Sequence, residues 1–151
     1  MPDRGAGMIK LILAVDGSQP ALRATIALIE AARLYRDPVH VDLVTVHLPI
    51  PPVGGFFDTV VSKDMVEQYY RDEGKHAIQS SEKMLAEACI AFTSHILVGS
   101  IAETIVIHGD TAQCRMIYMG TRGMGAVANM VMGSIATKVV HLALVPVVLV
   151  H

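Results

Sequence analysis

Tryptophan is absent from this chain of 151 residues, and cysteine occurs only twice, as Cys89 and Cys114. Two cysteines without a pairing pattern do not form a disulfide framework, so we expect two buried free thiols. Long apolar runs are also missing. The longest, at 139–150, is interrupted by His141 and Pro146 and is too short to cross a bilayer. The sequence therefore disfavours a disulfide-stapled domain and predicts no contact with a membrane.

Acidic residues are missing from the whole C-terminal segment 111–151, which has a formal charge of +3. Residues 1–110 contain 9 basic and 14 acidic residues and have a formal charge of −5. No basic cluster stands out in the chain, which disfavours nucleic acid as a partner. A polyanionic small ligand would meet the least repulsion near the C-terminal segment.

The N-terminal segment also lacks a long apolar core. Its apolar run Leu11 to Val15 is followed directly by Asp16, which is too short for a secretory signal. We therefore expect a cytoplasmic protein. A chain of this length can bury one substantial core, which predicts a single domain over residues 1–151.

Apolar runs alternate along the chain with stretches of helical periodicity, a pattern typical of a parallel sheet covered by helices. Strands are expected at 8–15, 40–48, within 92–98, at 115–119 and at 147–150. Helices are expected after Ser18, at about 60–90, from Ser100 to Gly109, and at 134–144. The sequence predicts an α/β fold, a five-stranded parallel sheet with helices on both faces.

Local signals refine the expected helices. Ser18 can cap the first helix, and Ser100 with Glu103 has the spacing of a capping box. The long helix is either straight or bent at Gly74. The expected apolar faces are Leu22, Ile26, Ile29 and Leu34 in the first helix, and Met65, Val66, Tyr69, Ala77, Met84, Leu85 and Ala88 in the long one.

Three spaced glycines and a serine stand between the fourth expected strand and the last helix. Gly120 is followed after two residues by Gly123, and after nine more by Gly133 and Ser134. Glycine leaves backbone amides unhindered, and the first amides of a helix have no partner within it, so this arrangement favours a phosphate. Glycines that serve turn geometry alone are the alternative.

Other phosphate motifs do not fit the chain. It has no Gly-Lys-Ser/Thr sequence, so a P-loop is excluded. Residues 123–128 match G-x-G-x-x-A, but they follow the fourth strand and no acid comes after them, which disfavours a dinucleotide fingerprint.

Several side chains follow the carboxyl ends of the expected strands, where open parallel sheets bind ligands. Asp16 is suited to accepting hydrogen bonds from a ribose, or it serves the turn before the first helix. His47 either lies near a bound base or is structural. Met124, Met130 and Met132 either cover a ligand, form a contact surface or fill the core.

These residues resemble the universal stress protein family, specifically its ATP-binding branch. That branch is marked by G-x2-G-x9-G-(S/T), which Gly120, Gly123, Gly133 and Ser134 match without a gap. The resemblance covers essentially the whole chain through the segments AVDGS, LVTVHL, VGSIAETIV, MGTRG and VPVVLV. It implies a Rossmann-like fold of the adenine nucleotide alpha hydrolase type, and ATP as ligand with Mg²⁺ or Mn²⁺. It also implies a homodimer through the C-terminal strand, which agrees with the need to cover an apolar sheet edge.

By this resemblance Asp16 contacts the ribose, and Arg122 either reaches a terminal phosphate or is solvated. No catalytic residue is implied. Some relatives have a hydroxyl residue where this chain has Ala136, a departure that removes a side-chain hydrogen bond of about 1 kcal/mol. The implied binding residues are Ala14, Asp16, Leu48, Met119, Gly120, Arg122, Gly123, Gly133, Ser134, Ile135 and Ala136.

Three functions are compatible with these features. The first is an ATP-binding regulatory module of stress adaptation, in which nucleotide occupancy shifts the dimer's conformation or its choice of an unidentified protein partner. The second is a slow ATPase or nucleotide-dependent transferase, for which Asp16 is the obvious candidate base. The third is a nucleotide-free dimeric scaffold that uses the long helix and the prolyl loop 49–57.

Overall fold

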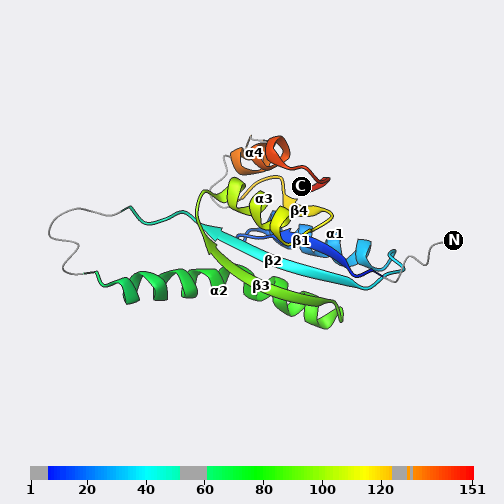
Figure 1. Cartoon of the computed structure of the whole chain (residues 1–151), viewed down its shortest axis with the longest axis horizontal. Coiled ribbons are helices and arrows are strands. Elements are labelled where there is room, and N and C mark those ends of the chain that lie inside the picture. The colour runs from blue at the N-terminus through cyan, green and yellow to red at the C-terminus, as the bar shows by residue number, and fades with distance from the viewer. Residues whose placement is uncertain (1–6, 52–60, 124–128, 130) are drawn as a thin grey trace.

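Helices and strands alternate along the chain in this computed structural model, which describes residues 7–51, 61–123, 129 and 131–151 (Figure 1). The elements are β1 (Ile9–Ala14), α1 (Gln19–Ala32), β2 (Val39–His47), α2 (Lys63–Glu87), β3 (Ala91–Val98), α3 (Ile101–Thr111), β4 (Ile117–Gly120), α4 (Ser134–Leu142) and β5 (Val147–Val150).

The five strands form one parallel sheet in the order β3-β2-β1-β4-β5, as the sequence predicts. From β1 the chain moves outward through β2 and β3, and it then returns to the other side of β1 for β4 and β5. The strand order therefore reverses between β1 and β4. The carboxyl ends of these two strands flank the place where such sheets bind ligands.

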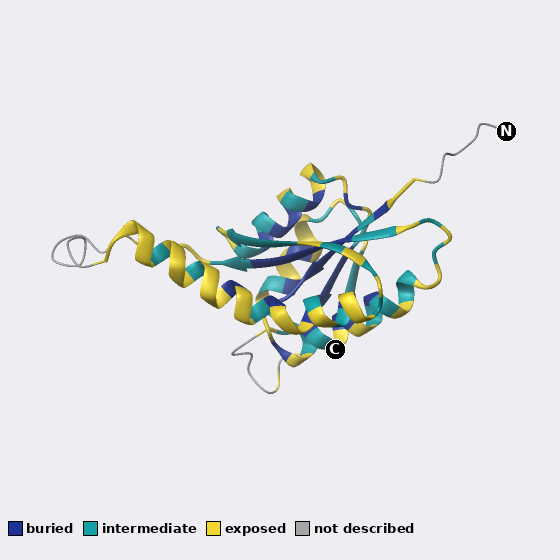
Figure 2. Cartoon of the chain, turned by 90° about the horizontal axis from the view of Figure 1, so that it is seen from below, coloured by how far each residue is buried: buried dark blue, intermediate teal, exposed yellow. Residues whose placement is uncertain are grey.

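Side chains that alternate along the strands build two cores, one on each face of the sheet. Leu11 and Leu13 of β1 pack with α1 and α2, whereas Ile12 and Ala14 pack with α3 and α4. The buried residues lie in the sheet and on the helix sides turned to it (Figure 2). The prediction of helices on both faces is confirmed.

Helix α1 begins as predicted, but its buried face matches the prediction only in part. Ser18 is its N-cap and accepts a hydrogen bond from the amide of Ala21 at 3.3 Å. Leu34 lies beyond the end of the helix and is 86% exposed, and Ile26 is 46% exposed, so the prediction is wrong for these two residues. Ile29 packs against the core, as predicted. The residues that are buried are mostly small: Ala21, Ala24, Thr25 and Leu28. Small side chains let the helix lie close to the sheet.

Helix α2 is longer than the sheet that it covers. Its N-terminal turns extend past the carboxyl ends of the strands (Figure 1), and there Met65 and Tyr69, expected on the apolar face, are more than half exposed. Gly74 is buried in the helix, where an added Cβ would lie 2.5 Å from Cγ2 of Ile96 in β3. The glycine therefore permits a close approach of α2 to β3.

The two ends of α3 differ from prediction. The helix continues past Gly109 to Thr111, and Gln113 takes the left-handed conformation after it, with φ of 57°. Ser100 is the N-cap residue, but its side chain does not cap the helix. Its hydroxyl donates to the Glu103 carboxylate at 2.5 Å, so the predicted capping box is wrong. The carboxylate is drawn instead towards Lys138 of α4, with which it forms an ion pair.

Other predicted boundaries and environments change modestly. Helix α4 ends at Leu142 rather than at residue 144, since Ala143 is already extended. Cys114 is buried as expected, and burial raises the pKa of its thiol to about 11. Cys89 is exposed, contrary to expectation, because it sits just past the end of α2 with φ of 56°.

The methionines of the glycine loop are only partly placed. Met132 packs against the core under α3 and α4, whereas Met124 and Met130 lie outside the described residues. None of the helices in the described part of the chain combines the length and the apolarity needed to cross a membrane.

Candidate functional site

A cavity of about 400 Å³ opens at the carboxyl ends of β1 and β4, where the strand order reverses. Its volume is in the range of small-molecule sites. Ten of the eleven residues predicted from the sequence line it: Ala14, Asp16, Met119, Gly120, Arg122, Gly123, Gly133, Ser134, Ile135 and Ala136. Residues distant in the sequence are thus brought together around one hollow.

Leu48, the eleventh predicted residue, does not line the cavity. It follows the end of β2, its side chain is 63% exposed, and its carbonyl accepts a hydrogen bond from the Tyr70 hydroxyl at 3.5 Å. His47 is also absent from the lining. Its neighbour Val46 faces the cavity, and alternation along the strand directs His47 towards α2, where its ring lies 6.1 Å from that of Tyr70. This placement favours the structural interpretation of His47.

Close packing explains two glycines of the motif. A Cβ at Gly120 would lie 2.6 Å from Cβ of Pro20, so glycine allows the end of β4 to pass the first turn of α1. A Cβ at Gly123 would lie 2.5 Å from Oδ2 of Asp16. Gly123 therefore leaves the space in which the Asp16 carboxylate approaches the loop after β4.

Asp16 serves the turn before α1 and also lines the cavity. Its Oδ1 accepts a hydrogen bond from the amide of Ser18 at 3.0 Å, which fixes the turn between β1 and α1. The residue is exposed and its Oδ2 faces Gly123 at the cavity. The turn thus orients a carboxylate at the cavity wall, where it can accept hydrogen bonds from a ligand.

The N-terminus of α4 forms another wall. Gly133 is the N-cap, its amide donates to the carbonyl of Thr121 at 2.6 Å, and no side chain in the described part of the chain caps this helix. The first turn, which begins with Ser134, Ile135 and Ala136, lines the cavity. Unpaired amides and the positive end of the helix dipole favour an anion there.

The opposite part of the cavity is apolar and is largely missing from the sequence prediction. Val44 and Val46 lie on the same face of β2, and Ile101 and Ile105 lie one turn apart on α3. Strand alternation and helical spacing could have suggested each pair. The two pairs face the same cavity because of the way α3 crosses the sheet, which no local pattern predicts.

The positive charge of the C-terminal segment is not gathered at the cavity. Arg122 lines it, but Arg115 precedes β4 at the other end of that strand. Lys138 pairs with Glu103, and this contact, followed by the hydrogen bond from Ser100, lowers the pKa of Glu103 to about 2. Arg122 is therefore the one cationic side chain among the described residues that line the cavity.

The arrangement can hold a ligand with an apolar ring and an anionic tail. The ring would pack between the valines of β2 and the isoleucines of α3, while the anion would meet the first amides of α4 and Arg122. Asp16 is the only acidic residue among the lining residues described, which leaves no second carboxylate for acid–base chemistry.

Comparison of the chain with known proteins gives a consistent result. Residues 8–151 match the Universal stress protein family. A universal stress protein of Thermus aquaticus is 32% identical over 147 residues, which cover 93% of this chain and 97% of that protein. One of Mycolicibacterium smegmatis is 29% identical over 150 residues, which cover 93% of this chain. The chain spans about half of the latter protein, 47% of its length.

Solved structures of the same family share the fold. Universal stress protein UspA from Lactobacillus plantarum superposes with a TM-score of 0.78 at 17% identity, over 95% of this chain and 97% of that one. The universal stress protein from Archaeoglobus fulgidus, solved in complex with dAMP, superposes with a TM-score of 0.64 at 25% identity. The match covers 97% of this chain and all of that one.

Proposed function

Because this chain belongs to the universal stress protein family, we propose that its cavity binds ATP and that the protein is a nucleotide-dependent regulatory module of stress adaptation. One observation supports this most strongly. The glycine motif, the N-terminus of α4 and Asp16 meet an apolar wall in one cavity at the switch point of the sheet. The Archaeoglobus relative solved with dAMP supports an adenine nucleotide as the class of ligand.

Each part of an adenine nucleotide has a counterpart in the cavity. The base would pack against Val46 and Ile105, and the ribose hydroxyls would donate to Asp16. The phosphates would accept hydrogen bonds from the amides of Gly123 and the first turn of α4. Arg122, which lines the cavity, would lie on the phosphate side, where a longer phosphate chain would gain most from its charge.

The residues present fit a magnesium or manganese ion that arrives with the nucleotide. Such ions retain several waters and are held mainly by substrate phosphates and one or two carboxylates. Asp16 is the acidic residue that could contribute, directly or through water. The ion would neutralise phosphate charge, while residues of the chain would bind the nucleotide itself.

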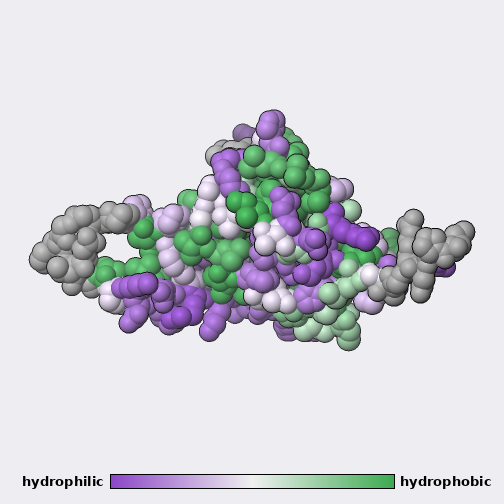
Figure 3. All heavy atoms as spheres, viewed as in Figure 1, coloured by the Kyte–Doolittle hydropathy of each residue, from purple (hydrophilic) through white to green (hydrophobic). Residues whose placement is uncertain are grey.

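We further propose that the protein forms a homodimer through β5, the edge strand next to β4. An apolar edge strand left uncovered invites pairing, so pairing with a second copy would protect it. Beside this edge, Leu142 and Leu144 at the end of α4 are exposed, and apolar side chains gather over α4 in the space-filling view (Figure 3). The cytoplasmic location, the unidentified protein partner and the absence of nucleic-acid binding stay predictions from the sequence.

Titration calorimetry with ATP and AMP tests the proposed function. The wild-type chain is expected to bind one ATP per protomer, and Arg122→Ala should weaken ATP binding by about tenfold, the value of one charge-assisted hydrogen bond, with a smaller effect on AMP. Arg115→Ala is the matched control, since Arg115 is an exposed arginine at the other end of β4.

Two results would count against this proposal. If ATP does not bind, the cavity is not a nucleotide site under these conditions and the scaffold function gains weight. If both arginine variants weaken ATP binding equally, the effect is one of overall charge, and the assigned position of the phosphates is wrong.

A further inference from the structure

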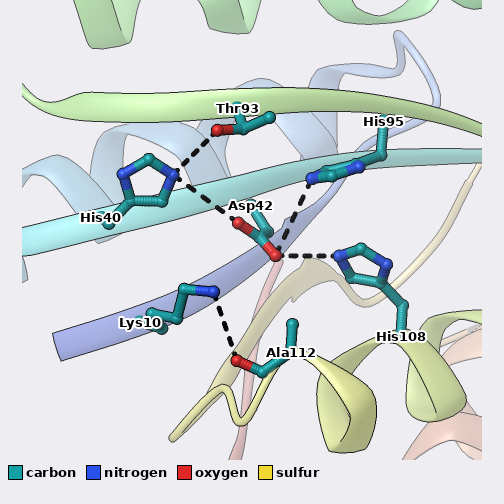
Figure 4. Close-up of polar contacts among 7 residues, drawn as sticks. All are labelled: Lys10, His40, Asp42, Thr93, His95, His108 and Ala112. Carbon is teal, nitrogen blue, oxygen red and sulfur yellow. Dashed lines mark hydrogen bonds and ion pairs between the residues drawn. The ribbon is translucent and has the colours of Figure 1, made fainter.

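A second group of polar side chains lies on the α3 side of the sheet, below the cavity. Asp42 of β2, His95 of β3 and His108 of α3 converge there, and one ligand atom from each lies within 4.8 Å of the other two. His108 Nε2 is 2.9 Å from Asp42 Oδ2, and His95 Nε2 is 3.8 Å from the same oxygen (Figure 4). The three residues come from three different elements, so no local sequence motif predicts the cluster.

The surroundings of Asp42 are unusual for a buried carboxylate. The residue is 4% exposed, and the basic side chains closest to it in the described structure are imidazoles. Lys10 donates its ammonium to the carbonyl of Ala112 at 3.4 Å instead. A buried carboxylate normally requires a paired cation or a metal, because its desolvation is costly.

His95 supplies an independent observation. Its Nε2 is buried, has no hydrogen-bond partner within the described structure, and points to the Asp42 carboxylate (Figure 4). A buried imidazole nitrogen without a hydrogen-bond partner, 3.8 Å from a carboxylate oxygen, is placed to share an ion with that carboxylate.

We propose that Asp42, His95 and His108 form a binding site for a divalent transition-metal ion, with Zn²⁺ as the preferred occupant. Two imidazole nitrogens and one carboxylate oxygen are a known type of zinc ligand set that leaves a fourth position for water. Ligand atoms about 2.1 Å from a tetrahedral ion are about 3.4 Å from each other. The separations of His108 Nε2 and His95 Nε2 from Asp42 Oδ2, 2.9 and 3.8 Å, bracket that value.

His40 and Thr93 complete an outer shell. His40 Nε2 lies 3.7 Å from the other carboxylate oxygen, Oδ1 of Asp42, and 2.9 Å from Oγ1 of Thr93. Contacts of this kind orient metal ligands and are typical of zinc sites. The side chains of His95 and His108 are 28% and 16% exposed, so the ion can enter from solvent.

This site is distinct from the nucleotide cavity but shares its supporting elements. Val44 and Ile105 line the cavity, whereas Asp42 and His108, further along the same faces of β2 and α3, form the metal site. A bound ion would tie α3 to β2 and β3 and so raise the stability of the fold, since it binds the folded chain alone.

Calorimetric titration of the full chain with zinc chloride, after treatment with a chelator, tests the proposal. One zinc ion per chain is expected. Asp42→Asn, His95→Gln and His108→Gln should each weaken binding by more than about 100-fold, the upper range for loss of an outer-shell residue. His76→Gln, which changes an exposed histidine on α2, is the matched control and should leave the affinity unchanged.

His95→Gln is the most informative variant, since it removes a ligand but no hydrogen bond that the structure describes. Its thermal midpoint without zinc should equal that of wild type, while the rise in midpoint with zinc is lost. Cobalt(II) provides a second readout, because a site with two imidazoles gives visible absorption bands that the ligand variants should abolish.

Two outcomes would overturn the proposal. One is a wild-type chain that binds no zinc at micromolar concentration. The other is zinc binding that His95→Gln and His108→Gln leave within twofold of wild type, or that His76→Gln reduces equally, since the ion would then sit on surface histidines.

Discussion

Substitution of Gly123 by valine should weaken nucleotide binding and leave the chain folded. The added Cβ would lie 2.5 Å from Oδ2 of Asp16, whereas ordinary contact begins at 3.4 Å. The carboxylate must therefore move by about 0.9 Å, the difference between these two distances. Asp16 is exposed, so its side chain can turn towards solvent without disturbing the core.

The displacement removes the acceptor that we assign to the ribose. A hydrogen bond to a charged group contributes about 1.5–3 kcal/mol, and each 1.4 kcal/mol is a factor of ten in affinity. Gly123→Val should thus weaken ATP binding by about 10- to 100-fold. Asp16→Asn should also weaken ATP binding, because an amide has one oxygen: if that oxygen accepts from Ser18, a donor-only amino group replaces Oδ2 at the cavity.

Calorimetric titration with Mg-ATP measures this effect, and urea unfolding checks that the variant is folded. Gly7→Val is the control, since Gly7 is an exposed glycine before the opposite end of β1. An affinity in Gly123→Val within twofold of wild type would refute the assigned roles of Gly123 and Asp16.

Three further predictions concern stability. The contact with Lys138 lowers the pKa of Glu103 to about 2, so the stabilisation from this pair is complete above about pH 4.5 and is lost as the pH falls towards 2. Glu103→Gln should remove this part of the acid dependence of the unfolding free energy, and an unchanged acid profile would contradict the pairing. Gly74→Val should lower the free energy of unfolding in urea by about 1–3 kcal/mol, because the added side chain overpacks against Ile96. Ile96→Ala in the same chain should relieve part of this loss, whereas strictly additive losses from the two substitutions would exclude the contact. Ser18→Ala should cost about 1 kcal/mol in thermal or urea unfolding through loss of the N-cap of α1, and an unchanged midpoint would mean that water replaces this cap.

The sequence predicted the features that local patterns encode. Five strands, their parallel pairing and the cap of α1 follow from apolar runs, alternation with helices and a serine in the right place. The glycine motif located the cavity because backbone amides at a helix start need glycine neighbours and a fixed spacing. The functional roles of the lining residues remain predictions until ligand binding is measured.

Features that depend on tertiary packing could not be predicted from the sequence. The face of α1 was predicted only in part, because small residues pack closest to the sheet while Ile26 and Leu34 remain exposed. Leu48 was expected in the cavity, but β2 ends at His47 and Val46 is the last of its residues to face the hollow. The crossing of α3 over the sheet brings Ile105 to the cavity, and it brings three residues 13 or more positions apart in the chain to the proposed metal site.

Identification of the nucleotide that accompanies the purified chain tests the central claim most directly. The protein would be purified without added nucleotide and denatured, and the released compounds would be identified by mass spectrometry in molar ratio to the chain. The proposed function predicts near-stoichiometric ATP, or ADP if turnover occurs, in the wild type and a marked loss in Gly123→Val. A wild-type chain that releases no adenine nucleotide and shows no thermal shift with Mg-ATP would contradict the claim.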